Sequence, residues 1–289
     1  EKPPFMDAPN LPIKFELKAR HRNGLLSIKN LSLSLISLNI TALLSGDISY
    51  FQNSFHDSQL QLKIFADDLS LLSRYFFKDT QVKGKSSLIL NYHPGKQDNG
   101  EVESELSFDR VSVHLPKNSL SFHNLNGNMK MKQRIWIDPK NFKNVQVVLI
   151  DRETFHRISA EEKYSDIFQT VLPGLFLKEF QYKDFSAQNI YFTPSYFHGL
   201  FQLKNIRAQM LNGSVSGSIM AALVNSPDII TSLQLQFTNL DLSLLSGLKS
   251  SEESQLGGSL KLFLALRNRD VEGHIRFDKM GSKLLDRML

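Results

Sequence analysis

Hydrophobic and polar residues alternate along much of this chain. The alternation is clearest in residues 31–35, which read LSLSL, and it recurs in other short runs. A period of two places successive side chains on opposite faces of a strand, so each run predicts a β-strand with one apolar and one polar face. Such strands are typical of antiparallel sheets. The runs lie at residues 11–19, 31–40, 60–64, 88–92, 111–115, 135–137, 145–149, 233–237 and 260–266.

Turn signals separate several of these runs, whereas helix signals are few. Turns are expected at residues 93–100, at Asn126-Gly127 and at Asn212-Gly213. A capping box at residues 159–162 predicts a helix that runs towards Thr170. Other helices or tight corners are expected at residues 68–72, 241–245 and 281–289. Asp67 and Asp68 are interpreted as caps of the first of these turns rather than as a cation site. So little helix would leave most of a sheet of about a dozen strands uncovered.

An internal repeat is the strongest sign of higher organisation. Residues 60–73 and 233–246 are identical at nine of 14 positions, and the same offset aligns Gly84 with Gly257. Residues 44–48 also resemble residues 215–219. The repeat predicts a structural duplication. The expected division is a lead-in strand (1–24), a first β-unit (25–150), a helix-containing connection (151–180) and a second β-unit ending in a helix (181–289).

Composition narrows the class of protein. The chain has 289 residues, of which 41% are hydrophobic and 22% charged, as in a globular protein rather than a disordered one. A net charge of +5 is too small for the usual footprint of a nucleic-acid-binding protein. The absence of cysteine excludes disulfides, thiol catalysis and cysteine-bearing zinc sites. No apolar run reaches the length of a membrane-spanning helix. Because the chain starts at Glu1 without a signal-peptide pattern, we expect a piece of a longer protein.

Motifs that would carry catalysis are missing. The eight histidines show no zinc-binding spacing, and Gly213–Gly217 has Val215 where a nucleophile elbow needs serine. No phosphate-binding glycine loop occurs. Lys130, Lys132 and Arg134 occupy every second position, which predicts a solvated strand face or, alternatively, a charged rim beside phosphate head groups. We therefore predict no catalytic residue, no metal site, no cofactor and no enzymatic activity.

The apolar strand faces are the remaining candidate site. An antiparallel sheet must cover its apolar face with a second sheet, with helices or with a ligand. The sequence is therefore compatible with a sandwich of two sheets or with one long curved sheet around an apolar groove. The residues predicted to line such a groove are Leu33, Leu35, Leu62, Ile64, Leu88, Leu90, Leu233, Leu235, Phe237, Leu260, Leu262 and Leu264.

Parts of the chain resemble a known family. Residues 203–219, 233–245, 257–262 and 275–289 are similar to the C-terminal module of AsmA-like proteins. The similarity covers about residues 200–289, and the repeat extends a weaker one back to about residue 25. It implies a mainly β fold in which a long, curved, antiparallel sheet forms a taco-like apolar groove, with a few short helices. Unlike the family, this sequence has no N-terminal anchor helix, and residues 93–200 do not match.

The resemblance also implies a function. AsmA-like proteins of Gram-negative bacteria are anchored in the inner membrane and extend through the periplasm. Their groove is thought to carry phospholipids towards the outer membrane. We therefore expect non-enzymatic binding and transport of phospholipids or other acyl-chain lipids, with the membrane and envelope proteins as partners and no nucleic acid. The alternatives are an envelope assembly factor that offers its sheet edges to outer-membrane proteins, a secreted β-sandwich binding module, or a hydrolase without a recognisable motif.

Overall fold

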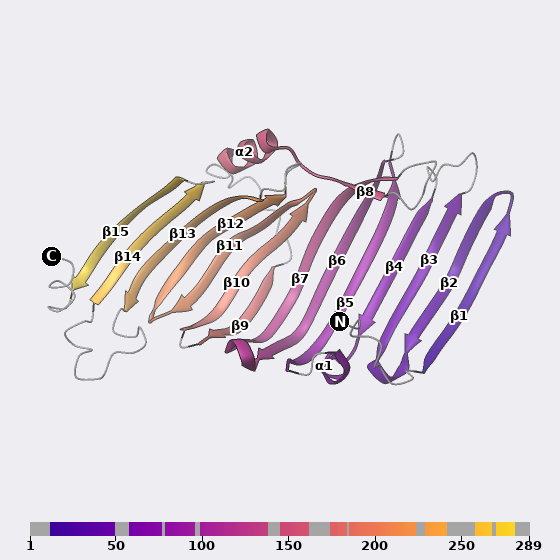
Figure 1. The fold of residues 1–289 in the computed structure, drawn as a ribbon, viewed down its shortest axis with the longest axis horizontal. Coiled ribbons are helices and arrows are strands. Elements are labelled where there is room, and N and C mark those ends of the chain that lie inside the picture. Colours follow the sequence, from indigo (N-terminus) through magenta and orange to yellow (C-terminus); the bar gives the residue numbers. More distant parts are fainter. Residues whose placement is uncertain are drawn as a thin grey trace.

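The described residues form one very large sheet. The computed structural model describes residues 12–49, 58–76, 79–95, 99–137, 145–161, 174–183, 185–223, 229–241, 258–267 and 270–280, the last two ranges by their backbone alone. All fifteen described strands belong to the same sheet (Figure 1). They are β1 (Ile13–Arg22), β2 (Leu25–Leu35), β3 (Ile40–Ser49), β4 (Gln59–Ala66), β5 (Gln81–Pro94), β6 (Asn99–Leu115), β7 (Leu120–Ile137), β8 (Val145–Val148), β9 (Leu175–Tyr182), β10 (Phe185–Phe197), β11 (Leu200–Met210), β12 (Gly213–Leu223), β13 (Ile229–Asp241), β14 (Gly258–Arg267) and β15 (Asp270–Met280).

Chain order and spatial order nearly coincide in this sheet. The strands follow one another from β1 to β7 and from β9 to β15, each antiparallel to its neighbour. β8 lies off this path and pairs with one end of β7. Beyond the end of the short β9, β10 pairs directly with β7 in the parallel sense, at Ser195–Phe197 against Lys130–Lys132. A single sheet excludes the sandwich alternative for the described residues.

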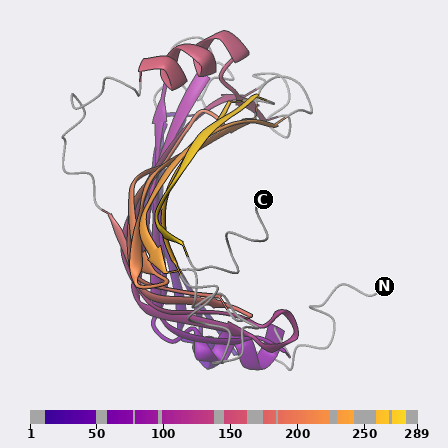
Figure 2. The ribbon, with the colours of Figure 1, turned by 90° about the vertical axis from the view of Figure 1, so that its left-hand side faces the viewer.

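The sheet is strongly curved. Seen along its long axis, the strands bend into an open arch that is C-shaped in cross-section (Figure 2). β1 and β15 lie at opposite ends of the long axis (Figure 1). The predicted fold class is therefore confirmed: the chain is mainly β, with a long curved antiparallel sheet that encloses a groove.

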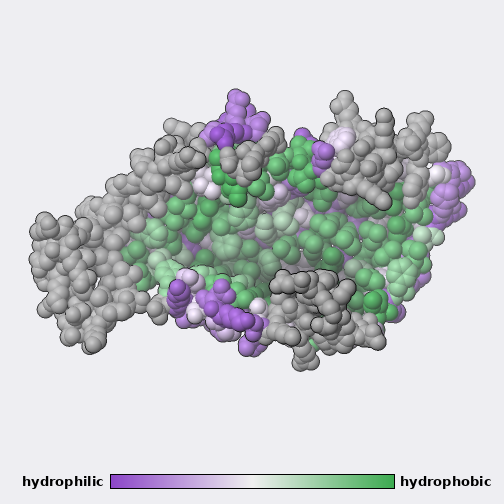
Figure 3. All heavy atoms as spheres, in the orientation of Figure 1, coloured by the Kyte–Doolittle hydropathy of each residue, from purple (hydrophilic) through white to green (hydrophobic). Residues whose placement is uncertain are grey.

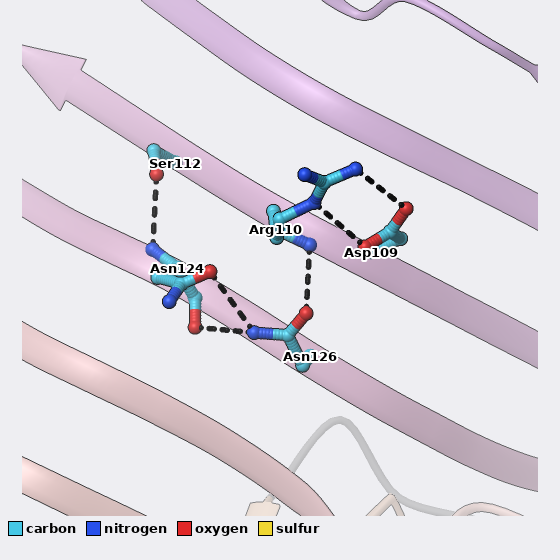
Figure 4. A network of polar contacts seen from close by, with 5 residues as sticks. All are labelled: Asp109, Arg110, Ser112, Asn124 and Asn126. Atoms are coloured by element: carbon cyan, nitrogen blue, oxygen red, sulfur yellow. Dashed lines mark hydrogen bonds and ion pairs between the residues drawn. The ribbon is translucent and has the colours of Figure 1, made fainter.

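Side-chain hydrogen bonds satisfy backbone groups where β6 and β7 change register. Arg110 and Asn124 have positive φ angles of 51° and 60°, and the register of the two strands shifts on either side of Val111. Here the Arg110 N–H donates to Asn126 Oδ1 at 2.8 Å, and the Asn124 N–H donates to Ser112 Oγ at 2.9 Å (Figure 4). These bonds replace ladder bonds that a bulge removes.

Asn126-Gly127 is therefore not a turn, and the turn prediction at this position was wrong. The pair lies inside β7, where Gly127 has a φ of 115°. A bulge uses the positive φ that Asn and Gly tolerate just as a turn does, so the dipeptide alone does not separate the two. The other two turn predictions are confirmed, because β5 and β6 form a hairpin and Leu211-Asn212 connects β11 to β12.

Two equivalent glycines connect the sequence repeat to the structure. Gly46 in β3 and Gly217 in β12 have φ angles of 136° and 157°. At each position a Cβ atom would lie 2.0 Å from a backbone oxygen of the next strand, Gln59 O or Gln234 O. Glycine is required at both because the backbones approach too closely for any side chain.

The helices are short. α1 (Ser70–Phe76) follows β4, and the Asp68 carboxylate accepts the Ser70 N–H at 2.9 Å, which confirms the predicted cap. α2 (Arg152–Glu161) begins earlier than the predicted capping box at 159–162. Asp151 caps it instead, because its Oδ1 accepts the Thr154 N–H at 2.6 Å. The helices expected towards Thr170 and at 241–245 and 281–289 lie outside the described residues.

Among the described residues, a buried hydrophobic cluster lies under α2. Ile150 and Phe155 pack there against Leu200, Met220, Ala222 and Ile230 of the sheet, with Ile158 at the margin. Leu200, Ala222 and Ile230 are register partners on three successive strands. α2 therefore covers one small region of one face. The expected division into two units and a connection stays a prediction, since the sheet runs without interruption across it.

Candidate functional site: an apolar groove on the concave face

Strand register aligns the apolar residues of successive strands into continuous rows. One row crosses seven strands at opposed positions, and a second runs beside it two residues further along each strand. The first row is Leu17, Leu31, Leu44, Leu62, Leu90, Ser104 and Met131; the second is Phe15, Leu33, Ala42, Ile64, Leu88, Leu106 and Met129. Because opposed residues of neighbouring strands share a face, each row is a stripe across one side of the sheet.

The second half of the sheet continues the same face. Through the parallel contact, Met131 of the first row is opposite Tyr196, which is opposite Phe201 and then Ala221. Three further rows cross β11 to β15 by backbone register: Leu203, Ile219, Leu233, Leu266 and Val271; Ile206, Gly217, Leu235, Leu264 and Gly273; and Ala208, Val215, Phe237, Leu262 and Ile275.

This apolar face is the concave one. Figure 3 looks into the hollow of the arch, where hydrophobic residues extend over the central strands and polar residues gather at the rims. The residues between the rows form the opposite, convex face and are mostly polar. A representative convex row is Glu16, Ser32, Leu43, Lys63, Ile89, Glu105 and Lys130. We call the concave surface formed by the apolar rows the groove.

Ten of the twelve residues predicted to line a groove occupy these rows, and Leu35 and Leu260 lie two residues beyond the rows on their own strands. Leu33, Ile64 and Leu88 share one row, and Leu62 lies opposite Leu90 in another. The register also places Leu235 opposite Leu264, Phe237 opposite Leu262, Leu233 opposite Leu266, Leu260 opposite Leu240, and Leu35 opposite Ile40. The nine of them whose side chains are described are all half-buried rather than buried. That degree of exposure indicates a surface that the described residues do not cover. The assignment of lipid contacts to them stays a prediction.

The groove rows carry no Asp, Glu, Lys or Arg. Tyr92 stands opposite Leu60 and Val102, and burial raises the pKa of its hydroxyl, which therefore stays neutral at ordinary pH. A surface of this composition offers apolar contact area. It has almost no charge or fixed dipole that could bind a polar ligand selectively.

Charges are concentrated on the convex face instead. Glu101, Glu103 and Glu105 of β6 stand opposite Arg134, Lys132 and Lys130 of β7. Lys132 Nζ lies 2.5 Å from Glu101 Oε1 and 3.1 Å from Glu103 Oε1, and both bonds raise the pKa of its ammonium. This favours the solvated-face interpretation of the basic residues, because the carboxylates already neutralise Lys132.

His198 connects the two halves of the sheet. It lies at the turn between β10 and β11, is only 7% exposed and has a φ of 47°. Its N–H donates to Lys132 O at 3.1 Å, its carbonyl accepts the Ile150 N–H at 2.8 Å, and its Nδ1 accepts the Arg134 N–H at 2.9 Å. One residue thus joins β7, the β10–β11 turn and the segment before α2.

We expect protonation of His198 to weaken this junction. Burial, followed by the nearby Arg134 guanidinium, lowers the pKa of the imidazole below its ordinary value of 6.5. A lowered folded-state pKa means that the folded protein binds the proton less well than the unfolded chain, so stability is full above pH 6.5 and falls as the pH drops towards the folded pKa. A proton on Nδ1 would also displace the Arg134 N–H, a loss of about 1 kcal/mol.

Urea unfolding between pH 7 and pH 5 measures this effect. The free energy of unfolding should fall across that interval in the wild type and should change much less in His198→Asn, since asparagine tolerates a positive φ and does not titrate. Lys132 and Glu101 also act on the imidazole and are retained in both proteins. Equal slopes for the two proteins would contradict the assignment.

The part of the chain that the structure describes was also searched for metal sites and for membrane-spanning helices. No group of three or more His, Asp or Glu side chains there is placed to hold a metal ion. Neither of the two described α-helices is long and apolar enough to cross a membrane.

Several groove residues were missed by sequence reasoning. Leu44, Met129, Met131 and Ile219 lie in the rows, where their register partners on neighbouring strands place them. The alternation of Met129 and Met131 with lysines was the available signal. β9, β10 and β11 were not predicted. In β10 and β11, register shifts interrupt the alternation.

The chain was compared with known proteins at the level of both sequence and structure. No family model matches it, and neither a curated protein nor a solved structure does so.

Proposed function

We propose that this protein binds the acyl chains of phospholipids, or of other lipids, in the groove and lets them pass along it without enzymatic chemistry. The observation that carries the proposal is the continuity of the apolar rows, which run from β1 to β7 and onward from β10 through β13 without a charged residue. A ligand without hydrogen-bonding groups along its length suits such a surface.

The energetics favour an acyl chain as the occupant. Each methylene removed from water contributes about 0.8 kcal/mol, so about a dozen methylenes would gain on the order of 10 kcal/mol before the loss of chain and ligand freedom. Neighbouring strands lie about 4.8 Å apart, so rows that cross many strands offer more length than one acyl chain needs. Several lipids could therefore lie in succession along the groove.

The shape of the groove suits a ligand with one polar end. The arch is open along one side, and polar residues gather at its rims (Figures 2 and 3). A head group can stay in water at this opening while its acyl chains lie against the rows. Selectivity among lipids would be low, because contacts with methylenes do not distinguish one head group from another.

The proposed location of the protein and the proposed direction of lipid transfer rest on the sequence resemblance. The similarity of residues 200–289 to AsmA-like proteins supports a place in the bacterial periplasm, attachment to the inner membrane in the full-length protein and transfer of phospholipid towards the outer membrane. The curved sheet is compatible with that role. The proposed binding of acyl chains in the groove does not depend on it.

A polarity-sensitive fluorophore tests the proposal directly. The chain has no cysteine, so Leu62→Cys places one label in the groove and Gln61→Cys places a matched label on the convex face one residue away. Addition of a short-chain phospholipid below its micellar concentration should shift the emission of the Leu62→Cys label to the blue and leave the Gln61→Cys label unchanged. Glycerol phosphate, which has the polar part alone, should shift neither. Equal shifts at both positions, or none at Leu62→Cys, would contradict the proposal.

A further inference from the structure

The two end strands of the sheet differ in charge. Along the described residues, neither β1 nor β15 has a strand on its outer side. β1 carries four basic residues and one acidic residue, whereas β15 carries three acidic residues and two basic residues. In β1 these are Lys14, Lys18, Arg20, Arg22 and Glu16; in β15 they are Asp270, Glu272, Asp278, Arg276 and Lys279.

The end at β1 also exposes apolar side chains. Ile13, Phe15 and Leu17 are 61%, 60% and 50% exposed. Their register partners on β2 are half-buried, because β2 has a strand on both sides. An edge strand with unpaired backbone groups and exposed apolar residues is a template for a further strand.

Strand direction allows a second copy to supply that strand. The path from β1 to β15 has fourteen strands, each antiparallel to the next, so β15 runs opposite to β1. A second copy in the same orientation, placed beside β1, therefore presents its β15 antiparallel to β1 with both concave faces on the same side. This is the pairing that already holds between all neighbours along the path.

We propose that the protein associates end to end, with β15 of one copy pairing antiparallel with β1 of the next. One register brings opposite charges together on the convex face and apolar residues together on the concave face. On the convex side it places Asp270 opposite Arg22, Glu272 opposite Arg20 and Arg276 opposite Glu16. On the concave side it places Ile275 opposite Leu17 and Phe277 opposite Phe15, so that the apolar rows continue into the next copy.

Pairing of β15 with β1 fits this edge better than pairing of two β1 strands does. Antiparallel β1–β1 pairing would set the basic residues of one copy against those of the other, which is unfavourable for like charges directly opposed. Pairing of unlike ends is heterologous and builds an open array rather than a closed dimer. The array would lengthen the groove, but the association requires only the edges and holds whether or not lipid is bound.

Cross-linking between single-cysteine variants tests the register. Opposed residues of antiparallel strands have Cα atoms about 4.5 to 5.5 Å apart, within the range of a disulfide. A mixture of Arg20→Cys and Glu272→Cys proteins should therefore form a disulfide-linked heterodimer on mild oxidation. The matched control, Lys14→Cys mixed with Glu272→Cys, moves one cysteine six residues along the strand, about 20 Å away. We expect at least about tenfold less heterodimer from that mixture.

Charge reversal tests the same contact without cysteines. Sedimentation velocity of the wild type should show association that grows with protein concentration and weakens with salt. Arg20→Glu/Arg22→Glu and Asp270→Lys/Glu272→Lys should each sediment as monomers, and an equimolar mixture of the two should associate again. A monomeric wild type at every concentration, or equal cross-linking in the matched and the displaced pairs, would overturn the proposal. Circular dichroism of each variant shows whether the sheet is retained.

Discussion

Replacing Leu235 by Asp is expected to remove bound lipid from this protein while leaving the sheet folded. Leu235 is a half-buried residue of β13 that stands opposite Gly217 on one side and Leu264 on the other, in the middle of a groove row. A carboxylate there would have to lose its water when an acyl chain lies over it. Since burial of an unpaired charge costs several kcal/mol, bound lipid should fall by at least about tenfold.

The neighbouring residue provides a matched control. Gln236 is exposed and lies on the convex face, opposite Ser216. Gln236→Asp introduces the same charge one residue along the same strand, so its lipid content should equal that of the wild type. Lipid per chain is measured after mild purification by extraction and mass spectrometry, with circular dichroism to verify folding. Similar losses in the two variants would mean that charge, and not position in the groove, determines lipid content.

The largest loss of stability is expected from alanine at the two equivalent glycines. In Gly217→Ala the new Cβ would lie 2.0 Å from Gln234 O and 3.0 Å from the Leu235 Cα, both backbone atoms that cannot rotate away. The φ of 157° adds strain for any L-residue. β12 and β13 would have to separate, so the free energy of unfolding should fall by about 3 kcal/mol or more.

Gly46→Ala should behave in the same way. Its Cβ would lie 2.0 Å from Gln59 O and 2.9 Å from the Leu60 Cα, the same geometry in the first copy of the repeat. Ser216→Ala, at an exposed position beside Gly217, should change stability by less than about 0.5 kcal/mol. Urea unfolding of the three variants checks both points. Small effects at both glycines would contradict the close backbone approach, and a large effect at only one would contradict their equivalence.

Much of the fold could be predicted because alternation is a local signal. Residues 31–35 and 60–64 indicate strands without knowledge of any neighbour, and β2 and β4 lie there. The cap at Asp68 depends on residues two apart and was predicted for the same reason. The start of α2 was missed because Asp151 and Ser159 are both competent caps, and only packing of Phe155 on the sheet selects the first.

The alignment of strands could not be predicted, because it depends on contacts between residues far apart in the chain. Register shifts lie beside the rows, at one extra residue of β2 between Ile28 and Leu31 and at Lys83/Lys85, and they change the alignment of the strands beyond them. The junction of β7 with β10 joins segments about 65 residues apart through His198. The half-buried state of the predicted groove residues follows from the curvature of the whole sheet. That curvature cannot be inferred from any single residue.

The central claim is that the concave face holds lipid. Native mass spectrometry of the protein, purified under mild conditions from a bacterial host and followed by lipid extraction, tests it most directly. We predict co-purified phospholipid at about one or more molecules per chain, bound without preference for a head group. A folded, monodisperse protein that carries no lipid, and that takes up none when phospholipid is added, would contradict the account.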